Sequence, residues 1–280
     1  MVRSPAAGTL KRKDGVTPLA AFPAADRRLI RGVFTDIDET LTTDSSLTAA
    51  AYAALESLKA AGLLVVPVTG RPAGWCDHIA RMWPVDAVVG ENGAFWMWPD
   101  RDGGRLRTRF VQSDSERAEG RRRLEAVRAQ VLREVPGAGI ASDQPYRLAD
   151  LAIDICEDVP ALPRESVDRI VAIFEAHGAH AKISSIHVNG WFGDYDKLTT
   201  TTLMMQEQFG VDLDAGRERY VFAGDSPNDA PMFGYFPNAI GVANVRDFAD
   251  RMTHLPRWIT TQRSGDGFAE MAQALLAGRC

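Results

Sequence analysis

The sequence predicts an α/β fold in which a parallel sheet is interrupted by an inserted α+β domain. Two observations lead to this expectation. Toward both ends of the chain, strands that are apolar throughout alternate with helices, which is typical of a parallel sheet covered on both faces. Between these parts, roughly from residue 93 to residue 190, a hairpin and strands of alternating polarity indicate a different kind of module.

The first part of the core is expected at residues 29–92. The segments LIRGVF, LLVVPVTG and AVVGENG each predict a buried strand. Between the first two, SSLTAAAYAALESLKAAG predicts a helix, and Gly62 suits the position just after its end. The apolar face of that helix consists of Leu47, Ala51, Ala54, Leu55 and Leu58.

The inserted domain is expected at residues 93–190. AFWMWPDRDGGRLRTRFV predicts a hairpin, residues 117–135 an amphipathic basic helix, and LADLAIDIC a half-buried strand. A second helix is marked by Val167, Ile170, Val171 and Phe174, and AKISSIHV predicts another strand.

The core pattern returns at residues 191–280. Here DKLTTTTLMMQEQFG predicts a helix, RYVFAG and NAIGVAN buried strands, and GFAEMAQALLAG a closing helix. Residues 1–28 are basic and lack a continuous apolar segment, so we expect a flexible tail and no signal peptide.

Composition favours a globular protein. The chain of 280 residues is 45% hydrophobic and 25% charged, and its net charge of -5 does not favour a nucleic-acid partner. No apolar run is long enough to predict a membrane span. Cys76, Cys156 and Cys280 show no metal or disulfide spacing, which favours reduced thiols in a cytoplasmic protein. The sequence indicates no particular oligomeric state.

Paired carboxylates follow the first predicted strand. Asp36 and Asp38 share one face while the chain stays extended, and Asp225 ends another predicted strand. Close carboxylates repel each other unless a cation lies between them, and Mg²⁺ suits a site of few carboxylates with water and phosphate oxygens. We therefore expect a Mg²⁺ site at the carboxyl ends of the strands. The alternative, a capping role, explains Asp38 more easily than Asp36.

The segment GDSPND has two interpretations. Ser226, Pro227 and Asp229 have the spacing of a capping box with proline at the first helical position, which needs no catalytic role. Capping does not account for Asp225 or Asn228. Asp229 could serve both as a cap and as an outer partner of the metal.

Two further motifs could bind phosphate. In VTGRP, the Thr69 hydroxyl, the Gly70 backbone and the Arg71 guanidinium follow a predicted strand, although an ordinary turn explains them equally well. Lys197 stands near the start of a predicted helix, where its charge opposes the helix dipole. A nearby concentration of negative charge favours that placement. The alternative is a solvated lysine balanced by Asp194 and Asp196.

In this order, the motifs resemble those of the haloacid dehalogenase-like (HAD) superfamily. Two aspartates followed by threonine match Asp36, Asp38 and Thr40, and the hydroxyl and lysine motifs match Thr69 and Lys197. The segment GDSPND matches the last acidic motif. An α+β insert between VTGRP and the lysine is similar to the C2B cap of the type IIB, Cof-like branch, which includes sucrose-phosphate and mannosyl-phosphoglycerate phosphatases. The resemblance implies a Rossmann-like core with an inserted cap.

By this resemblance, Asp36 is the nucleophile and Asp38 the general acid and base, while Thr69 and Lys197 hold the phosphoryl oxygens. Mg²⁺ is expected on Asp36, the main-chain carbonyl of Asp38 and Asp225, with Asp229 nearby. The implied activity is hydrolysis of a small phosphate ester, most simply a sugar phosphate. The alternatives are a phosphomannomutase-like mutase and a module that binds a metabolite without catalysis.

Substrate contacts are expected from both domains. The candidates are Gly70, Arg71, Asn92, His187, Asn189 and Asn228. Arg105, Arg107 and Arg109 share one face of the predicted hairpin, where a solvated edge is the simpler interpretation than an anion-binding surface. The chain departs from the family pattern at Glu39, where many members have glycine, and the larger residue is expected to limit backbone freedom.

Overall fold

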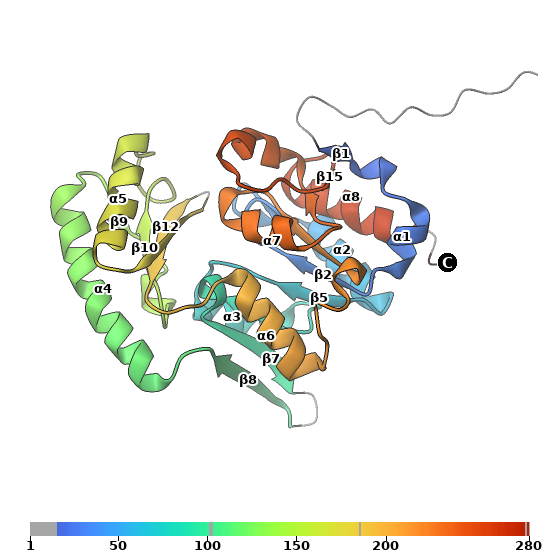
Figure 1. The fold of residues 1–280 in the computed structure, drawn as a ribbon, viewed down its shortest axis with the longest axis horizontal. Coiled ribbons are helices and arrows are strands. Elements are labelled where there is room, and N and C mark those ends of the chain that lie inside the picture. The colour runs from blue at the N-terminus through green and yellow to red at the C-terminus, as the bar shows by residue number, and fades with distance from the viewer. Residues whose placement is uncertain (1–15, 101–102, 185, 278, 280) are drawn as a thin grey trace, which may run out of the picture.

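The structure is a computed structural model that describes residues 16–100, 103–184, 186–277 and 279. A parallel sheet of six strands runs through the core in the order β1–β15–β14–β13–β2–β5 (Figure 1). The strands are β1 (Thr17–Pro18), β2 (Gly32–Thr35), β5 (Leu64–Pro67), β13 (Tyr220–Gly224), β14 (Ile240–Gly241) and β15 (Trp258–Ile259). The predicted parallel sheet is therefore confirmed.

Helices cover both faces of this sheet, as the apolar strands predict. Val33 of β2 packs in the apolar core on one face, and Phe34 packs in the core on the other. The first face carries α2 (Ala49–Ala60), α3 (Ala73–Met82) and α8 (Ser264–Leu276), with α1 (Ala24–Leu29) against α8. The second face carries α6 (Lys197–Phe209) and α7 (Ala230–Tyr235). Gly62 follows the end of α2 with φ +77°, as predicted.

The predicted hairpin belongs with the core rather than with the insert. Its strands β7 (Phe95–Asp100) and β8 (Arg105–Phe110) extend β6 (Val88–Gly90), which meets the parallel sheet at a bridge between Val68 and Val89. Phe95 is buried in the first core and Trp96 in the second. Alternating polarity predicts a half-buried strand but not the sheet that the strand joins. We therefore propose that the insert begins near residue 111, and "the insert" means residues 111–190 below.

Residues 16–28 correct the expectation of a flexible tail. β1 pairs with β15 at the edge of the sheet, and Phe22 is buried, with its ring stacked on Trp258 at a centroid distance of 4.9 Å. Leu19 is buried beside them. Alanine and proline separate these apolar residues, so they show neither a helical nor a strand period. Residues 1–15 of the predicted tail lie outside the described residues.

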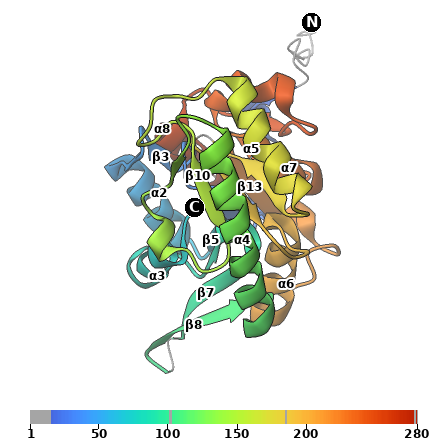
Figure 2. The ribbon, with the colours of Figure 1, turned by 90° about the vertical axis from the view of Figure 1, so that its left-hand side faces the viewer.

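The insert is an α+β module. Its antiparallel sheet has the order β11–β12–β10–β9, and α4 (Asp114–Glu134) and α5 (Arg164–Ala176) cover one face (Figures 1 and 2). The strands are β9 (Gly139–Ile140), β10 (Leu151–Asp154), β11 (His180–Ile183) and β12 (His187–Trp191). Val188 of β12 packs against the helices. Because side chains alternate along a strand, His187 and Asn189 point to the opposite face, toward the core.

The remaining elements are short. β3 (Thr42–Thr43) and β4 (Ser46–Leu47) form a hairpin through Asp44 and Ser45, which both have positive φ. The 3-10 turns are η1 (Leu19–Ala21), η2 (Glu91–Gly93), η3 (Gln144–Tyr146), η4 (Arg217–Arg219), η5 (Pro227–Asp229) and η6 (Ala243–Arg251). Within the described ranges, no helix combines the length and apolarity needed to cross a bilayer.

Glycine at position 190 is required by a close approach in the insert. A Cβ there would lie 2.1 Å from the ring of Phe174. We expect Gly190→Ala to destabilise the protein by about 1–3 kcal/mol through overpacking, measured by urea unfolding.

The control is Gly120→Ala in α4, where an added Cβ meets Phe192 at 3.8 Å, an ordinary contact. It should stabilise the protein by about 0.5–1 kcal/mol, since alanine is the better helix former. Equal effects of the two substitutions would contradict the packing described for β12 and α5.

Candidate active site

The candidate site lies at the carboxyl end of β2. This strand lies between β5, which follows it in the sequence, and β13, which belongs to the second half of the core. Ligands of open α/β sheets bind where strand order reverses in this way. Asp36 follows β2, Thr69 follows β5 and Asp225 follows β13, so one edge of the sheet gathers all three.

Lys197 joins two of the predicted acidic residues. Its Nζ donates to Asp36 Oδ1 at 2.8 Å and to Asp229 Oδ1 at 2.9 Å. The lysine is the first residue of α6, which Asp196 caps, so the solvated alternative is wrong: the ammonium is buried among carboxylates. Although burial opposes its charge, Asp229 and Asp36 together raise the pKa of Lys197.

Asp229 has the two roles that its position allows. It completes a capping box with Ser226 at η5, as the sequence predicts. Its Oδ2 accepts hydrogen bonds from the backbone N–H groups of Asp225 and Ser226, while its Oδ1 receives Lys197. Asp225 itself accepts from the Thr40 hydroxyl and from Asn244 Nδ2. The capping residue Asp229 therefore also helps to fix the positions of Asp225 and Lys197 in the acidic cluster.

Among the described residues, three buried carboxylates lie close together near one ammonium group, which bonds two of them. One oxygen atom each from Asp36, Asp225 and Asp229 lies within 4.8 Å of the others. With Lys197 included, the formal charge of this group is -2 when all three acids are ionised. Burial raises the pKa of Asp36 to about 7, and it also raises the pKa of Asp225. A divalent cation with oxygen ligands fits both the donor set and the uncompensated charge.

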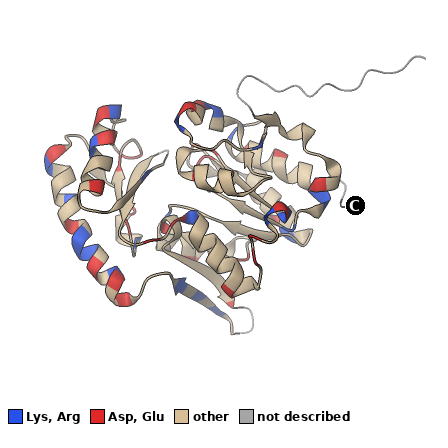
Figure 3. Ribbon diagram, viewed as in Figure 1, with Lys and Arg blue, Asp and Glu red and all other residues tan. Residues whose placement is uncertain are grey.

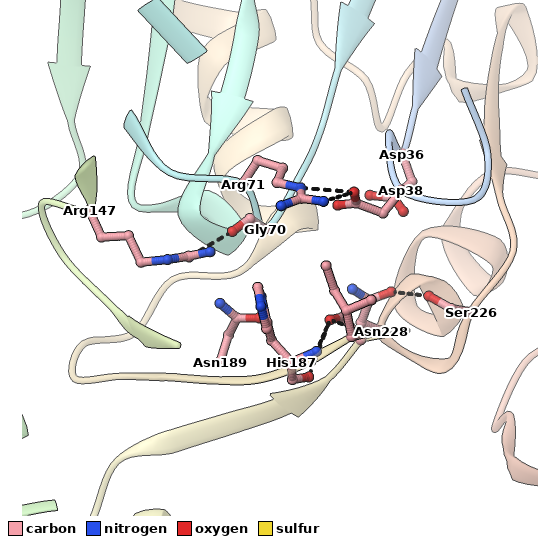
Figure 4. A pocket seen from close by; sticks show the side chains of 11 residues that line it. Asp36, Asp38, Gly70, Arg71, Arg147, His187, Asn189, Ser226 and Asn228 are labelled. Carbon is pink, nitrogen blue, oxygen red and sulfur yellow. Dashed lines mark hydrogen bonds and ion pairs between the residues drawn. The ribbon is translucent and has the colours of Figure 1, made fainter. Parts of the chain in front are cut away.

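Asp38 is held by Arg71. The guanidinium approaches Asp38 Oδ1 at 2.8 Å through Nε and 2.7 Å through a terminal nitrogen (Figure 4). Its other side lies 3.3 Å from Glu157 of the insert, and its charge lies over the Trp75 ring. Arg71 therefore contacts carboxylates in this structure, whereas the sequence suggested a phosphate contact.

Glu157 is a functional candidate that the sequence analysis missed. Its Oε2 lies 2.8 Å from His187 Nε2, and this contact, followed by the charge of Arg71, lowers the pKa of Glu157 to about 2. The Asp154 carboxylate shapes the loop by accepting the backbone N–H groups of Cys156, Glu157 and Asp158. The sequence signal was an aspartate closing a strand just before a tight turn.

The insert also reaches the turn after β5. Arg147, almost fully buried, donates to the Gly70 carbonyl at 2.9 Å and forms ion pairs with Asp143 and Asp150. Asp150 accepts a hydrogen bond from Asn189 Nδ2 at 3.2 Å. Gly70 and Asn189, two predicted substrate contacts, are thus linked through Arg147 and Asp150, which the sequence analysis did not select.

Most predicted site residues line one enclosed pocket (Figure 4). The predicted ones are Asp36, Asp38, Gly70, Arg71, His187, Asn189 and Asn228. Lys197 and Asn92 line an adjoining hollow together with Asn228. The Nδ2 of Asn92 is buried and has no hydrogen-bond partner among the described residues, which leaves a donor for a ligand. Thr69 is buried, and its hydroxyl accepts from the Arg71 backbone.

Two other expectations have clear outcomes. Glu39 adopts φ +55°, the left-handed conformation that glycine adopts most easily, and its carboxylate is held by Ser45 N and Ser264 Oγ. Figure 3 shows basic residues along β8, and none of them lines the pocket. Arg107 pairs with Asp100 and Arg109 with Glu207, which supports a solvated edge.

Comparisons with known proteins give one match in sequence and several in fold. Residues 33–114 match the family model of haloacid dehalogenase-like hydrolases. No curated protein sequence matches the chain.

Solved structures share the fold over nearly the whole chain. A Thermoplasma acidophilum protein is 19% identical with a TM-score of 0.65, covering 88% of this chain and 98% of that one. A putative HAD/Cof-like hydrolase from Plasmodium vivax is 15% identical, with a TM-score of 0.64 and coverage of 91% and 98%. A sucrose-phosphatase from Synechocystis, solved with sucrose and phosphate, is 14% identical, with a TM-score of 0.62 and coverage of 88% and 98%.

Residues 33–114 therefore resemble haloacid dehalogenase-like hydrolases in sequence, and the solved structures share the fold of the chain.

Proposed function

We propose that the chain is a Mg²⁺-dependent phosphomonoester hydrolase that works through an aspartyl-phosphate intermediate. The observation that carries this proposal is the buried Asp36 carboxylate, which a lysine orients and which lies beside two further acids. A solvated or capping aspartate needs none of these partners. The family match supports hydrolysis, and Asp38 in the same pocket supplies the group that a phosphate ester needs for its leaving oxygen.

The reaction proceeds in two displacements. Asp36 attacks phosphorus, the bond to the leaving oxygen breaks, and Asp38 gives that oxygen a proton. Water then attacks phosphorus, Asp38 takes up its proton, and the bond to Asp36 breaks to release phosphate. Lys197 attracts the phosphoryl oxygens in both displacements. In this structure Asp38 accepts from Arg71, so each proton transfer would require Asp38 to bond the substrate or water instead.

Mg²⁺ would be held by Asp36, the Asp38 carbonyl and Asp225, with Asp229 nearby. When bound, the ion neutralises charge on the carboxylates and the phosphoryl group. The three clustered carboxylates fit this role, since one lysine leaves them undercompensated. The resemblance to haloacid dehalogenase-like hydrolases also implies Mg²⁺.

We propose that the leaving group is an uncharged polyol or sugar. The two arginines of the pocket are each paired with carboxylates, Arg71 with Asp38 and Arg147 with Asp143 and Asp150. A second acidic group on the substrate would have to displace these partners. The amide groups of Asn189 and Asn228 suit hydroxyl groups. The sucrose-phosphatase of the same fold is consistent with a sugar phosphate.

The leaving group would extend into a groove between the insert and the core. The enclosed pocket holds about 10 Å³, room for about one water molecule. A groove of about 630 Å³ adjoins it, and Ser184 and Ser226 line both spaces. Val167 of α5 and Phe248 of η6 form opposite apolar walls of the groove.

The first test replaces the proposed nucleophile. Asp36→Asn should lower the turnover of phosphate esters by at least about a thousandfold, because the amide is not a nucleophile. Turnover should also stop in EDTA and return with Mg²⁺. The measurement is phosphate release from a panel of esters.

The matched control is Asp77→Asn on the exposed face of α3, which should keep full activity. Full activity of Asp36→Asn would refute the mechanism. Isomerised sugar phosphate with little free phosphate would indicate the mutase, and ligand binding without turnover would indicate a non-catalytic module.

The second test uses the raised pKa of Asp36. The pKa of the Asp36 carboxyl group in the folded protein is about 7. Below that pH, protons therefore compete with Mg²⁺ for this carboxylate. Mg²⁺ affinity should therefore fall as the pH is lowered below about 7, by about tenfold or more per pH unit, because the pKa of Asp225, a second proposed ligand, is raised as well. Calorimetric titration at several pH values measures this dependence. An affinity that stays constant from about pH 8 to about pH 5.5 would contradict the assignment of Asp36 as a metal ligand.

The third test fills the groove. Val167→Trp should lower kcat/KM for a disaccharide phosphate by about tenfold or more, and that for glycerol phosphate much less. Ala172→Trp on the same helix, an exposed position outside the groove, is the control. Equal losses for both esters would show that the groove does not hold the leaving group.

A further inference from the structure

A buried glutamate of the core accepts hydrogen bonds from the insert. Glu91, in the turn η2 after β6, is fully buried. Its Oε2 accepts from the backbone N–H of Ala149 at 2.6 Å and of Asp150 at 3.2 Å. Its Oε1 accepts from Leu148 N and from Ala73 N at the start of α3, both at 2.9 Å. One carboxylate thus joins a core helix to three consecutive residues of the insert.

The conformation of this turn is unfavourable in isolation. Glu91 and Asn92 have φ values of +44° and +55°, which non-glycine residues rarely adopt. Burial, with a smaller effect from Asp150, raises the pKa of Glu91 to about 7. A buried acid is tolerated where its oxygens are fully hydrogen-bonded, and here most of the donors come from the insert. Removing those donors would leave the carboxylate and the strained turn without compensation.

The segment that Glu91 holds leads directly to the active-site pocket. Arg147, next to this segment, donates to the Gly70 carbonyl beside Arg71 (Figure 4). Asp150, within the segment, pairs with Arg147 and accepts from Asn189 Nδ2. Gly70 and Asn189 lie on opposite sides of the pocket, one in the core and one in the insert. Their separation therefore depends on where residues 147–150 sit.

We propose that Glu91 is a positioning residue that fastens residues 147–150 of the insert to the core and thereby sets the position of Asn189 relative to the Gly70–Arg71 turn. The kinetic part of this inference rests on the proposed phosphatase function, whereas the fastening does not. A glutamate that only stabilised the fold would bond groups of the core alone. Three of its four donor residues belong to the insert, so its loss loosens the insert first.

The test is Glu91→Gln, which keeps the size but turns one oxygen into an amide nitrogen that faces N–H donors. The control is Glu270→Gln. Glu270 likewise accepts backbone N–H groups, from Thr261 and Gln262, but it lies on α8 away from the insert. Hydrogen exchange of the peptide covering residues 148–150 should accelerate by about tenfold or more in Glu91→Gln only. Unchanged exchange would overturn the fastening.

The kinetic measurement separates positioning from stability. In Glu91→Gln, KM for a sugar phosphate should rise by about tenfold, while inhibition by inorganic phosphate changes by less than about twofold, because Asp36 and Lys197 are untouched. A lower kcat at constant KM would indicate only loss of folded protein and would overturn positioning.

If Glu91→Gln does not fold, a second variant tests the same proposal. Asp150→Asn keeps Glu91 but weakens the hold on Arg147 and Asn189, so it should raise KM in the same way, and an unchanged KM would overturn positioning. If the wild-type protein hydrolyses no phosphate ester, the proposed function fails, and hydrogen exchange alone then decides whether Glu91 fastens the insert.

Discussion

One ammonium group among three buried carboxylates is the constraint on which the rest of the structure depends. Lys197 lies in the second half of the core, yet it bonds Asp36 from the first half. This contact requires β2 beside β13 and the first turn of α6 above their carboxyl ends. Closely spaced buried carboxylates destabilise the fold unless a positive charge offsets their repulsion. The packing of these elements therefore depends on the same charged groups that form the site.

Hydrogen bonds to buried charged residues also hold the insert in place. Glu91 and Arg147 are both buried, and each bonds the other domain. Glu91 accepts from backbone N–H groups of the insert, and Arg147, which is paired with Asp143 and Asp150 of the insert, donates to the Gly70 carbonyl of the core. Neither contact would persist if the insert moved far from the core at this point. The groove lined by Val167 and Phe248 lies at another part of the junction, where the two domains leave open space. Tight contact and open space thus occupy different parts of one junction.

The sequence predicted the part of the site that follows from strand ends and helix caps. Asp36, Asp225 and Lys197 could be placed because apolar strands and helix starts fix where their side chains emerge. Glu91, Arg147 and Glu157 could not, because the contacts that bring them to the site join residues far apart in the sequence, and no local period records such contacts. The same reason explains residues 16–28, whose burial depends on Trp258 far along the chain.

The position of Asp38 is coupled to the position of the insert. Arg71 bonds Asp38 on one side and Glu157 on the other, and Glu157 in turn contacts His187. Each partner limits where Arg71 can point, and Arg71 limits where the Asp38 carboxylate can point. A substrate hydroxyl that engages His187 would therefore act on the same chain of contacts that holds the proposed proton donor. Recognition of the leaving group and delivery of its proton would then depend on one continuous set of contacts across the two domains.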